Sequence, residues 1–244
     1  MLACIEELLH EVERVSGATV VVQEDPAMSQ TAGMTYARHG APAHVLRYRP
    51  HGDPSYPIAV QAGYALRYFS APADKRLDLC LPDERRAEVM RRLQIPGTLP
   101  TRVQNMVVDG LLLQVRSFPV GFRVEPWLRE TYPELIDGQV ECIHRQLQEN
   151  VRALSPEVRR SMPKKAVTAS TRMNAAFALF WSRLLGEPQQ WVPYKATGYE
   201  SEAQSLLSVL EVVPAGPEYD TVLVDQWAQK LALSGLYEWV PHHA

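Results

Sequence analysis

The sequence is poor in cysteine and has no long run of apolar residues. Its three cysteines, Cys4, Cys80 and Cys142, lie far apart and form no Cys-x-x-Cys pair. An odd number of scattered cysteines is typical of free thiols in a reducing compartment and argues against a disulfide-stabilised scaffold. The longest apolar stretches, such as residues 175–181, are far shorter than the roughly 20 residues of a membrane-spanning helix. We therefore expect no membrane partner.

The sequence also lacks the short motifs of several common enzyme classes. It contains no Walker loop, no Gly-x-Gly-x-x-Gly after a strand, no Gly-x-Ser-x-Gly elbow and no His-Glu-x-x-His pair. The glycine-rich loops bind phosphates, the elbow exposes a nucleophilic serine, and two histidines one helical turn apart bind zinc. The sequence therefore predicts no cofactor and no metal site.

What the chain does contain is the composition of an ordinary globular protein. Hydrophobic residues make up 46 % of its 244 residues and charged residues 22 %, which is sufficient for a buried core. The net charge of −3 gives no general attraction to nucleic acid. The first residues, Met1 to Glu7, lack the basic start of a signal peptide. Together these features predict a cytoplasmic protein.

The hydrophobic pattern changes character along the chain. It predicts a helix over residues 2–15, strands over 19–22, 33–37 and 44–49, and a helix over 56–69. Helices then follow at roughly 83–94, 100–116, 125–131, 133–154, 164–185, 199–211 and 219–236, with proline-rich breaks between them, one of them at Phe118-Pro119. The predicted fold class is α+β, with a small N-terminal β-sheet followed by a mostly helical C-terminal part. We expect an α+β portion over residues 1–95 and a mainly helical portion over 96–244, packed on it as one compact unit.

The predicted helix at 56–69 carries the one resemblance to a known family. It contains the segment Ala-Val-Gln-Ala-Gly-Tyr-Ala-Leu-Arg, and it follows a helix and three strands, the second of which begins with Ala-Gly. This order resembles the ImmA/IrrE-type zinc peptidases of bacteria and phages, which share a zincin core. If Gly63 stands at the glycine of their His-Glu-x-Gly-His motif, the zinc ligands fall on Val60 and Tyr64. The catalytic glutamate falls on Gln61.

The resemblance implies a zincin-like fold without its chemistry. Val60 has no donor atom, Tyr64 is a rare ligand, and Gln61 cannot act as a general base near neutral pH. In the family a later helix supplies the third ligand, and the candidate counterpart at 164–185 contains no Asp, Glu, His or Cys. The resemblance therefore implies an inactive peptidase-like protein that binds another protein, encoded in the same bacterial operon.

Several residues are candidates for contacts with such a partner. Arg67 lies on the same predicted helix as Val60 and Tyr64, one turn further along. Trp191, Tyr194 and Tyr199 lie in a segment interrupted by proline and glycine, where aromatic rings either anchor the loop or contact a partner. We also expect the C-terminal segment 224–239 to form a docking helix. His242 and His243 are expected to lie in a frayed terminus.

Two alternative functions remain open from the sequence. A metal-independent hydrolase would use Cys142, His144 and Glu141, which lie within four residues of one another. A nucleic-acid-binding accessory factor would use the basic segment 159–165 at the start of a predicted helix, a position that favours phosphate. Its candidate phosphate contacts are Arg159, Arg160, Lys164 and Lys165.

Overall fold

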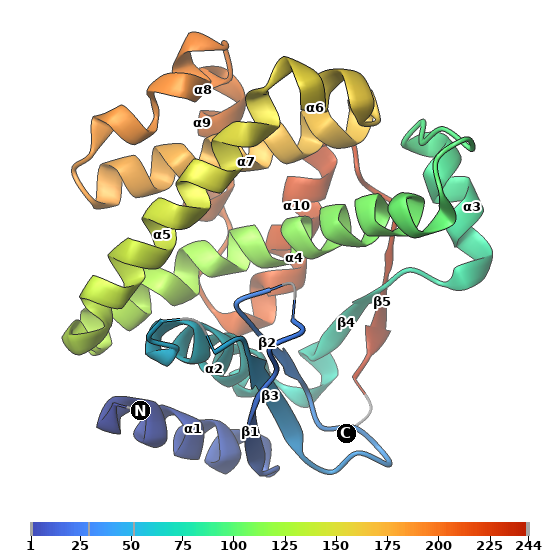
Figure 1. Cartoon of the computed structure of the whole chain (residues 1–244). Coiled ribbons are helices and arrows are strands. Elements are labelled where there is room, and N and C mark those ends of the chain that lie inside the picture. The colour runs from blue at the N-terminus through green and yellow to red at the C-terminus, as the bar shows by residue number, and fades with distance from the viewer. Residues whose placement is uncertain (1, 29, 51, 243–244) are drawn as a thin grey trace.

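Helices dominate the structure, and the strands form two small sheets. The computed structural model describes residues 2–28, 30–50 and 52–242. Helices account for 66 % of it, beside one three-stranded and one two-stranded sheet. The predicted α+β class, with a small N-terminal sheet followed by a mostly helical part, is confirmed (Figure 1).

The N-terminal part agrees with the predicted elements to within two residues. It consists of α1 (Ala3–Ser16), β1 (Val20–Glu24), β2 (Ala32–Thr35), β3 (His44–Tyr48) and α2 (Ser55–Ser70). The sheet order is β1-β3-β2, with β1 parallel and β2 antiparallel to β3. Strand β2 therefore lies at an edge of the sheet, where it also packs against α2.

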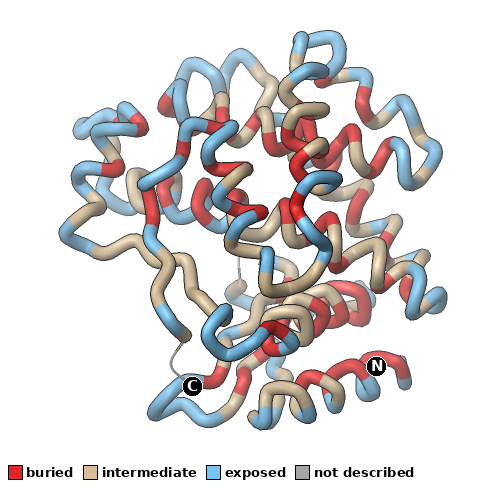
Figure 2. Tube along the Cα trace, turned by 180° about the vertical axis from the view of Figure 1, so that it is seen from behind, coloured by how far each residue is buried: buried red, intermediate tan, exposed pale blue. Residues whose placement is uncertain are grey.

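Helix α1 is held by the apolar stripe that the sequence shows. Ile5, Leu8, Leu9 and Val12 are buried against α2 and the sheet, and Figure 2 shows the exposed residues of α1 on its outer side. The helix ends at Gly17, whose φ of 76° is a left-handed conformation that glycine adopts without strain. The amide of Gly17 donates to the carbonyl of Glu13, which completes the last turn.

The remaining elements form the helical part and a second sheet. They are β4 (Leu77–Cys80), α3 (Asp83–Arg92), α4 (Thr101–Thr131), α5 (Ile136–Val151), α6 (Pro156–Ser161), α7 (Lys164–Leu184), α8 (Val192–Ala196), α9 (Glu200–Val212), α10 (Asp220–Lys230) and β5 (Glu238–Pro241). Helix α7 matches its predicted range closely. Among the described residues, no helix combines the length and the apolar composition that crossing a membrane would require.

Helix α4 belongs to both hydrophobic cores of the molecule. Its first half supplies Val108 and Val115 to a large core formed with α3, α5, α7, α9 and α10. Its second half supplies Val124 and Leu128 to the core formed by α1, α2 and the three-stranded sheet. Figure 1 shows α4 in green, running between these two parts. The helix therefore links the N-terminal and the helical portions across the predicted division at residue 95.

The predicted break at Phe118-Pro119 is wrong, because α4 continues through it. Pro119 and Pro126 both lie inside the helix. An interior proline removes one backbone hydrogen bond and costs about 3 kcal/mol. On either side of Pro119, however, Val115, Phe122 and Val124 are buried, and each such side chain contributes roughly 1.5–3 kcal/mol. Burial on both sides outweighs the local preference for a break.

The helix in the C-terminal segment is shorter than predicted. Helix α10 ends at Lys230, and the backbone then turns through positive φ values at Ala232 (58°) and Gly235 (71°). Between these turns Leu233 is buried in the helical core. The chain continues into β5, which pairs antiparallel with β4. The predicted docking helix over 224–239 is therefore wrong after residue 230, where turns and the start of β5 take its place.

His242 is held in place, contrary to the expected frayed terminus. Its Nδ1 lies 2.9 Å from Oδ2 of Asp78, and its Nε2 lies 3.0 Å from the carbonyl oxygen of Ala37. Its side chain is only 2 % exposed. Pairing of β5 with β4 carries the imidazole to this position, which no local pattern encodes. His243 lies outside the described residues.

The contact between α2 and α4 depends on the absence of a side chain at Gly63. A Cβ atom built on Gly63 would lie 2.8 Å from Cγ1 of Val124, closer than two carbon atoms normally approach. We predict that Gly63→Ala destabilises the protein by about 1–3 kcal/mol, because overpacking outweighs the better helix propensity of alanine. Thermal and urea unfolding would measure the change.

Gly110 provides the matched control for this substitution. It lies on an exposed part of α4, and nothing lies within 4 Å of a Cβ atom built there. Gly110→Ala should therefore stabilise the protein by about 0.5–1 kcal/mol. Adding Val124→Ala to Gly63→Ala should relieve the overlap, and a double variant without coupling between the two sites would contradict this account.

Candidate functional site

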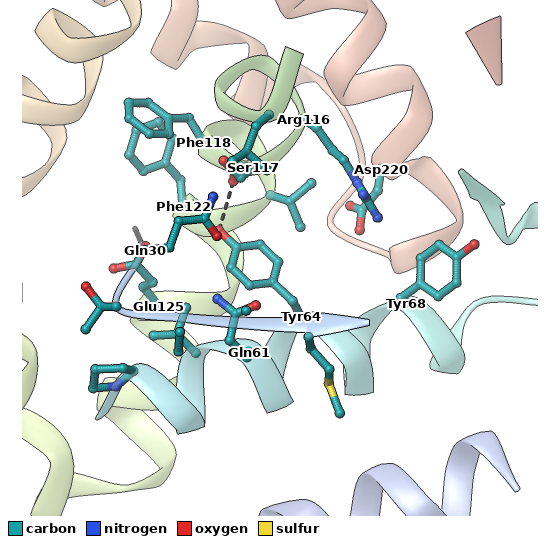
Figure 3. Close-up of a pocket in the computed structure, with 18 of the residues that line it drawn as sticks. Gln30, Gln61, Tyr64, Tyr68, Arg116, Ser117, Phe118, Phe122, Glu125 and Asp220 are labelled. Atoms are coloured by element: carbon teal, nitrogen blue, oxygen red, sulfur yellow. Dashed lines mark hydrogen bonds between the residues drawn. The ribbon is translucent and has the colours of Figure 1, made fainter. Parts of the chain in front are cut away.

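A large cleft runs between the N-terminal sheet and the helical part. Its volume is about 860 Å³, within the range of known ligand pockets. Strand β2 forms one side, and α2, α4 and α5 contribute most of the remaining wall. Figure 3 shows Gln61 and Tyr64 from α2 and Ser117 and Glu125 from α4 around this space. The cleft brings together segments far apart in the sequence.

Strand β2 faces the cleft along its length. An unbroken run of residues, 30–36, lines it. The amide of Arg49 donates to the carbonyl of Thr31, so in the antiparallel pairing Thr31, Gly33 and Thr35 bond to β3. The alternate residues Ala32 and Met34 then direct their N–H and C=O groups away from β3. Within the described chain no hydrogen bond to these outward groups is found, so the edge is open.

The three positions singled out on α2 all lie in this cleft. Val60, Gln61 and Tyr64 line it beside β2. The hydroxyl of Tyr64 donates to the carbonyl of Ser117 on α4 at 2.9 Å. It can approach α4 so closely because residue 121 is glycine: a Cβ atom there would lie 2.6 Å from the hydroxyl oxygen. Tyr64 thus serves as a bridge between the two helices.

Glu125 is a candidate functional residue that the sequence pattern did not reveal. It lies on α4 one turn after Gly121 and lines the cleft. Its Oε2 accepts a hydrogen bond of 2.8 Å from the hydroxyl of Tyr56. Burial raises the pKa of Glu125 to about 7, and the hydrogen bond from Tyr56 only partly opposes this. The signal in the sequence was one acidic residue among the apolar positions Phe122, Val124 and Leu128.

A buried amide supports this carboxyl group from behind. Gln139 on α5 is 1 % exposed, and its Nε2 donates to the backbone carbonyl of Glu125 at 2.9 Å and to the hydroxyl of Tyr56 at 3.3 Å. Arg129 donates to Oε1 of Gln139 at 3.1 Å. These bonds fix the position of Tyr56 and therefore the orientation of the Glu125 side chain.

The donor atoms around Val60 and Tyr64 do not fit a zinc ion. Zinc in peptidases takes three protein ligands from His, Asp or Glu and keeps one position open. Here Val60 has no donor and the Tyr64 hydroxyl is bonded to Ser117, which leaves the carboxyl of Glu125. Nowhere among residues 2–28, 30–50 and 52–242 do three or more His, Cys, Asp or Glu gather in a way that could hold a metal. Of the helices that follow α2, α4 and α5 pack on it, whereas α7, the expected counterpart, packs on α4, α5 and α9.

Arg67 is engaged within the chain. Its guanidinium forms a bidentate ion pair with Asp220, with Nε–Oδ2 and Nη2–Oδ1 distances of 2.7 Å. Nη2 also donates to the carbonyl of Ala215. Arg123 lies 3.6 Å from the same carboxylate. Burial raises the pKa of Asp220 despite these cations. The group ties α2 to the start of α10.

The candidate aromatic contacts lie mostly in the helical core. Trp191 is 7 % exposed and Tyr194 is 0 % exposed, and their rings stack with centroids 6.1 Å apart. Tyr199 packs against the same core while partly exposed. Of the two roles left open by the sequence, the structure places Trp191 and Tyr194 in that of anchors for their loop.

The three residues of the alternative hydrolase do not converge. Cys142 lines the cleft, and burial raises the pKa of its thiol, which disfavours the nucleophilic thiolate. His144 is two residues further along α5, so it points to another side of the helix. Its Nε2 lies 2.7 Å from Oε2 of Glu187. Glu141 accepts a hydrogen bond from Arg145 at the surface.

The basic segment 159–165 lies at the surface where α6 meets α7. Arg159, Arg160, Lys164 and Lys165 are all exposed. Two of them bond to nearby backbone: Arg160 to the carbonyl of Pro156 and Lys165 to that of Arg92. None of the four lines the cleft, so the structure does not join this segment to the site.

The raised pKa of Glu125 predicts how the free energy of unfolding depends on pH. Its pKa is about 7 in the folded protein and near the ordinary 4.5 in the unfolded chain, so the unfolded chain ionises first. Its contribution to stability is complete below pH 4.5 and is lost as the pH rises through 7. A glutamine side chain at this position cannot ionise, so Glu125→Gln should be more stable than wild type by about 1–3 kcal/mol near pH 8.

Unfolding in urea between about pH 5 and pH 8 would measure this difference. The gain should shrink towards pH 5, where the wild-type carboxyl keeps its proton. Glu149→Gln is the matched control, because Glu149 also lines the cleft but is exposed. A Glu125→Gln variant that is less stable at pH 8 would show that the carboxylate is compensated by contacts not seen in this structure.

Comparison of the chain with models of protein families, with curated protein sequences and with solved structures finds no match.

Proposed function

We propose that this protein is a catalytically inactive, peptidase-like module that binds an extended segment of another protein in its cleft. The observation that carries this proposal is the open edge of β2 along the cleft, with unbonded N–H and C=O groups at Ala32 and Met34. Such an edge accepts an extended peptide as an added strand, through backbone hydrogen bonds that need no particular sequence. The neighbouring walls of the cleft, formed by α2 and α4, supply contacts for its side chains.

The chemistry of the cleft supports binding without cleavage. Hydrolysis of a peptide bond needs an activated water or nucleophile and a group that stabilises the oxyanion. Val60 and Gln61 supply none of these, and burial raises the pKa of Tyr56 and Tyr64 well above its ordinary value, so both phenols stay neutral. Glu125 could accept a proton, but among the described residues no nucleophile and no oxyanion-stabilising group lie beside it. The resemblance to zinc peptidases supports the same conclusion, with the partner encoded in the same operon.

The three free thiols support a cytoplasmic location for this complex.

Selection from a library of random eight-residue peptides on the immobilised protein would test the proposal. We expect peptides that bind in extended form and protect the outward amides of Ala32 and Met34 from hydrogen exchange. Met34→Pro should weaken their binding at least about tenfold, because it removes one of these donors. Proline at this position leaves the pairing with β3 intact, since edge strands tolerate it there.

Met34→Ala is the matched control, because it removes the side chain and keeps the N–H. It should retain most of the affinity if backbone pairing carries the binding. Equal losses in both variants would show that the methionine side chain, and not the strand edge, binds the peptide. Failure of the library to yield any peptide that competes for the cleft would overturn the proposal.

The cleft lacks the protein ligands that a zinc ion needs, which leads to a second prediction. Elemental analysis of the purified protein should find well below one zinc per chain, since Glu125 and Cys142 in the cleft are fewer than the three protein ligands that such a site needs. Peptides recovered from the selection should stay intact on prolonged incubation, as judged by mass spectrometry. One tightly bound zinc per chain, or cleavage that a chelator abolishes, would contradict the inactive state.

A further inference from the structure

We propose that Glu125 is a recognition site for a cationic side chain, lysine or arginine, of the segment that binds along β2. This inference rests on the proposed function and adds the chemistry of the ligand to it. Glu125 lies on α4 where this helix faces α2, and it is a half-buried acidic group that lines the cleft. A basic side chain pointing from the bound strand towards α4 would meet it.

The first observation is that Glu125 has half of its bonding capacity unused. Its Oε2 accepts from Tyr56, while no donor to Oε1 and no ion pair to Glu125 occur in the part of the chain that the structure describes. A carboxylate that is largely removed from water and has no cation beside it is costly, and such groups are normally paired. A ligand that carries a cation would supply the missing partner.

The second observation is that the groups facing Glu125 leave its charge uncompensated. From α2 it is faced by Tyr56 and Tyr64, and from α5 by Cys142, all neutral groups. Arg129, one turn further along its own helix, is bonded to Gln139. Only burial and the hydrogen bond from Tyr56 shift the pKa of Glu125, so no cation lowers it.

The other charged groups that line the cleft are paired within the chain or have no effect on the pKa of Glu125. Arg116 acts on the pKa of Tyr36, Tyr64 and Tyr68, and not on that of Glu125. Arg145 is bonded to Glu141, and Asp78 and Asp220 are bonded to residues of the chain. Of the remaining charged groups that line the cleft, Arg38 lies by Asp78, Glu149 is exposed, and Arg49 and Lys75 come from the β3 side and from the segment after α2.

The third observation is the aromatic lining around the carboxyl group. Tyr56, Tyr64, Phe118 and Phe122 all line the cleft, and Figure 3 shows the last three in the same space as Glu125. Aromatic walls suit the long aliphatic stem of lysine or the flat guanidinium of arginine, and attract the cation itself. Acidic or short polar side chains would gain neither contact.

A pair of matched peptides tests the inference. Eight-residue strand-forming peptides of alternating valine and threonine would carry one lysine, moved through the sequence, or norleucine in its place. Norleucine has the same carbon chain without the ammonium group. Near pH 8 we expect the best lysine peptide to bind wild-type protein at least about tenfold more tightly than its norleucine partner. Fluorescence anisotropy would measure both affinities.

Variants of the protein separate a local contact from a general charge effect. Glu125→Gln should reduce the affinity for the lysine peptide to that for norleucine, because the amide keeps the shape and loses the charge. Glu149→Gln removes the same charge from an exposed position in the same cleft and should keep the preference. For wild-type protein, the preference should fall on going from about pH 8 to pH 5.5, since protonation of Glu125 removes its charge.

The outcomes are distinguishable. Equal affinities for the lysine and norleucine peptides overturn the inference and leave the peptide-binding function standing. If Glu125→Gln and Glu149→Gln reduce the preference for lysine equally, the inference is also overturned. That result would indicate a general effect of negative charge in the cleft and no local contact with Glu125. If no strand-forming peptide binds and the library yields none, the proposed function fails and the inference falls with it. Circular dichroism of each variant would confirm that the fold is retained.

Discussion

The close contact between α2 and α4 is the constraint on which the rest of this structure depends. It is possible because residue 63 has no side chain and Val124 occupies the space. Since α4 also enters the helical core through Val108 and Val115, the same contact fixes the helical part against the N-terminal sheet. The cleft lies beside this contact. The contact therefore positions both the open edge of β2 and the helical wall formed by α2 and α4.

Several long-range polar contacts complete this arrangement. Arg67 and Asp220 join α2 to the start of α10, and His242 joins the C-terminal end of β5 to Asp78 and Ala37. Because such groups are largely buried, each would be costly if its partner were removed. These contacts therefore stabilise one arrangement of the two cores. They also hold the residues around the cleft in place.

The cleft departs from the rules that govern the rest of the fold. Glu125 is half-buried beside Tyr56 without a cation, and burial raises the pKa of its carboxyl group. Polar groups that weaken the folded state are typical of functional sites, where they serve a ligand and not the fold. The open edge of β2 has the same character, since unpaired strand edges are normally protected. Both features lie in one cleft, which supports one ligand that satisfies both.

Local pattern by itself determined most helices and strands of this protein, because apolar spacing and glycine turns act over a few residues. It also placed Val60, Gln61 and Tyr64 on one helix and showed that they cannot hold zinc. Only the tertiary structure decided that α4 passes through Pro119, that β5 pairs with β4, and that Glu125 faces α2. These features depend on contacts between residues far apart in the chain, where the energy of burial outweighs local preference. A single sequence contains no direct record of such contacts.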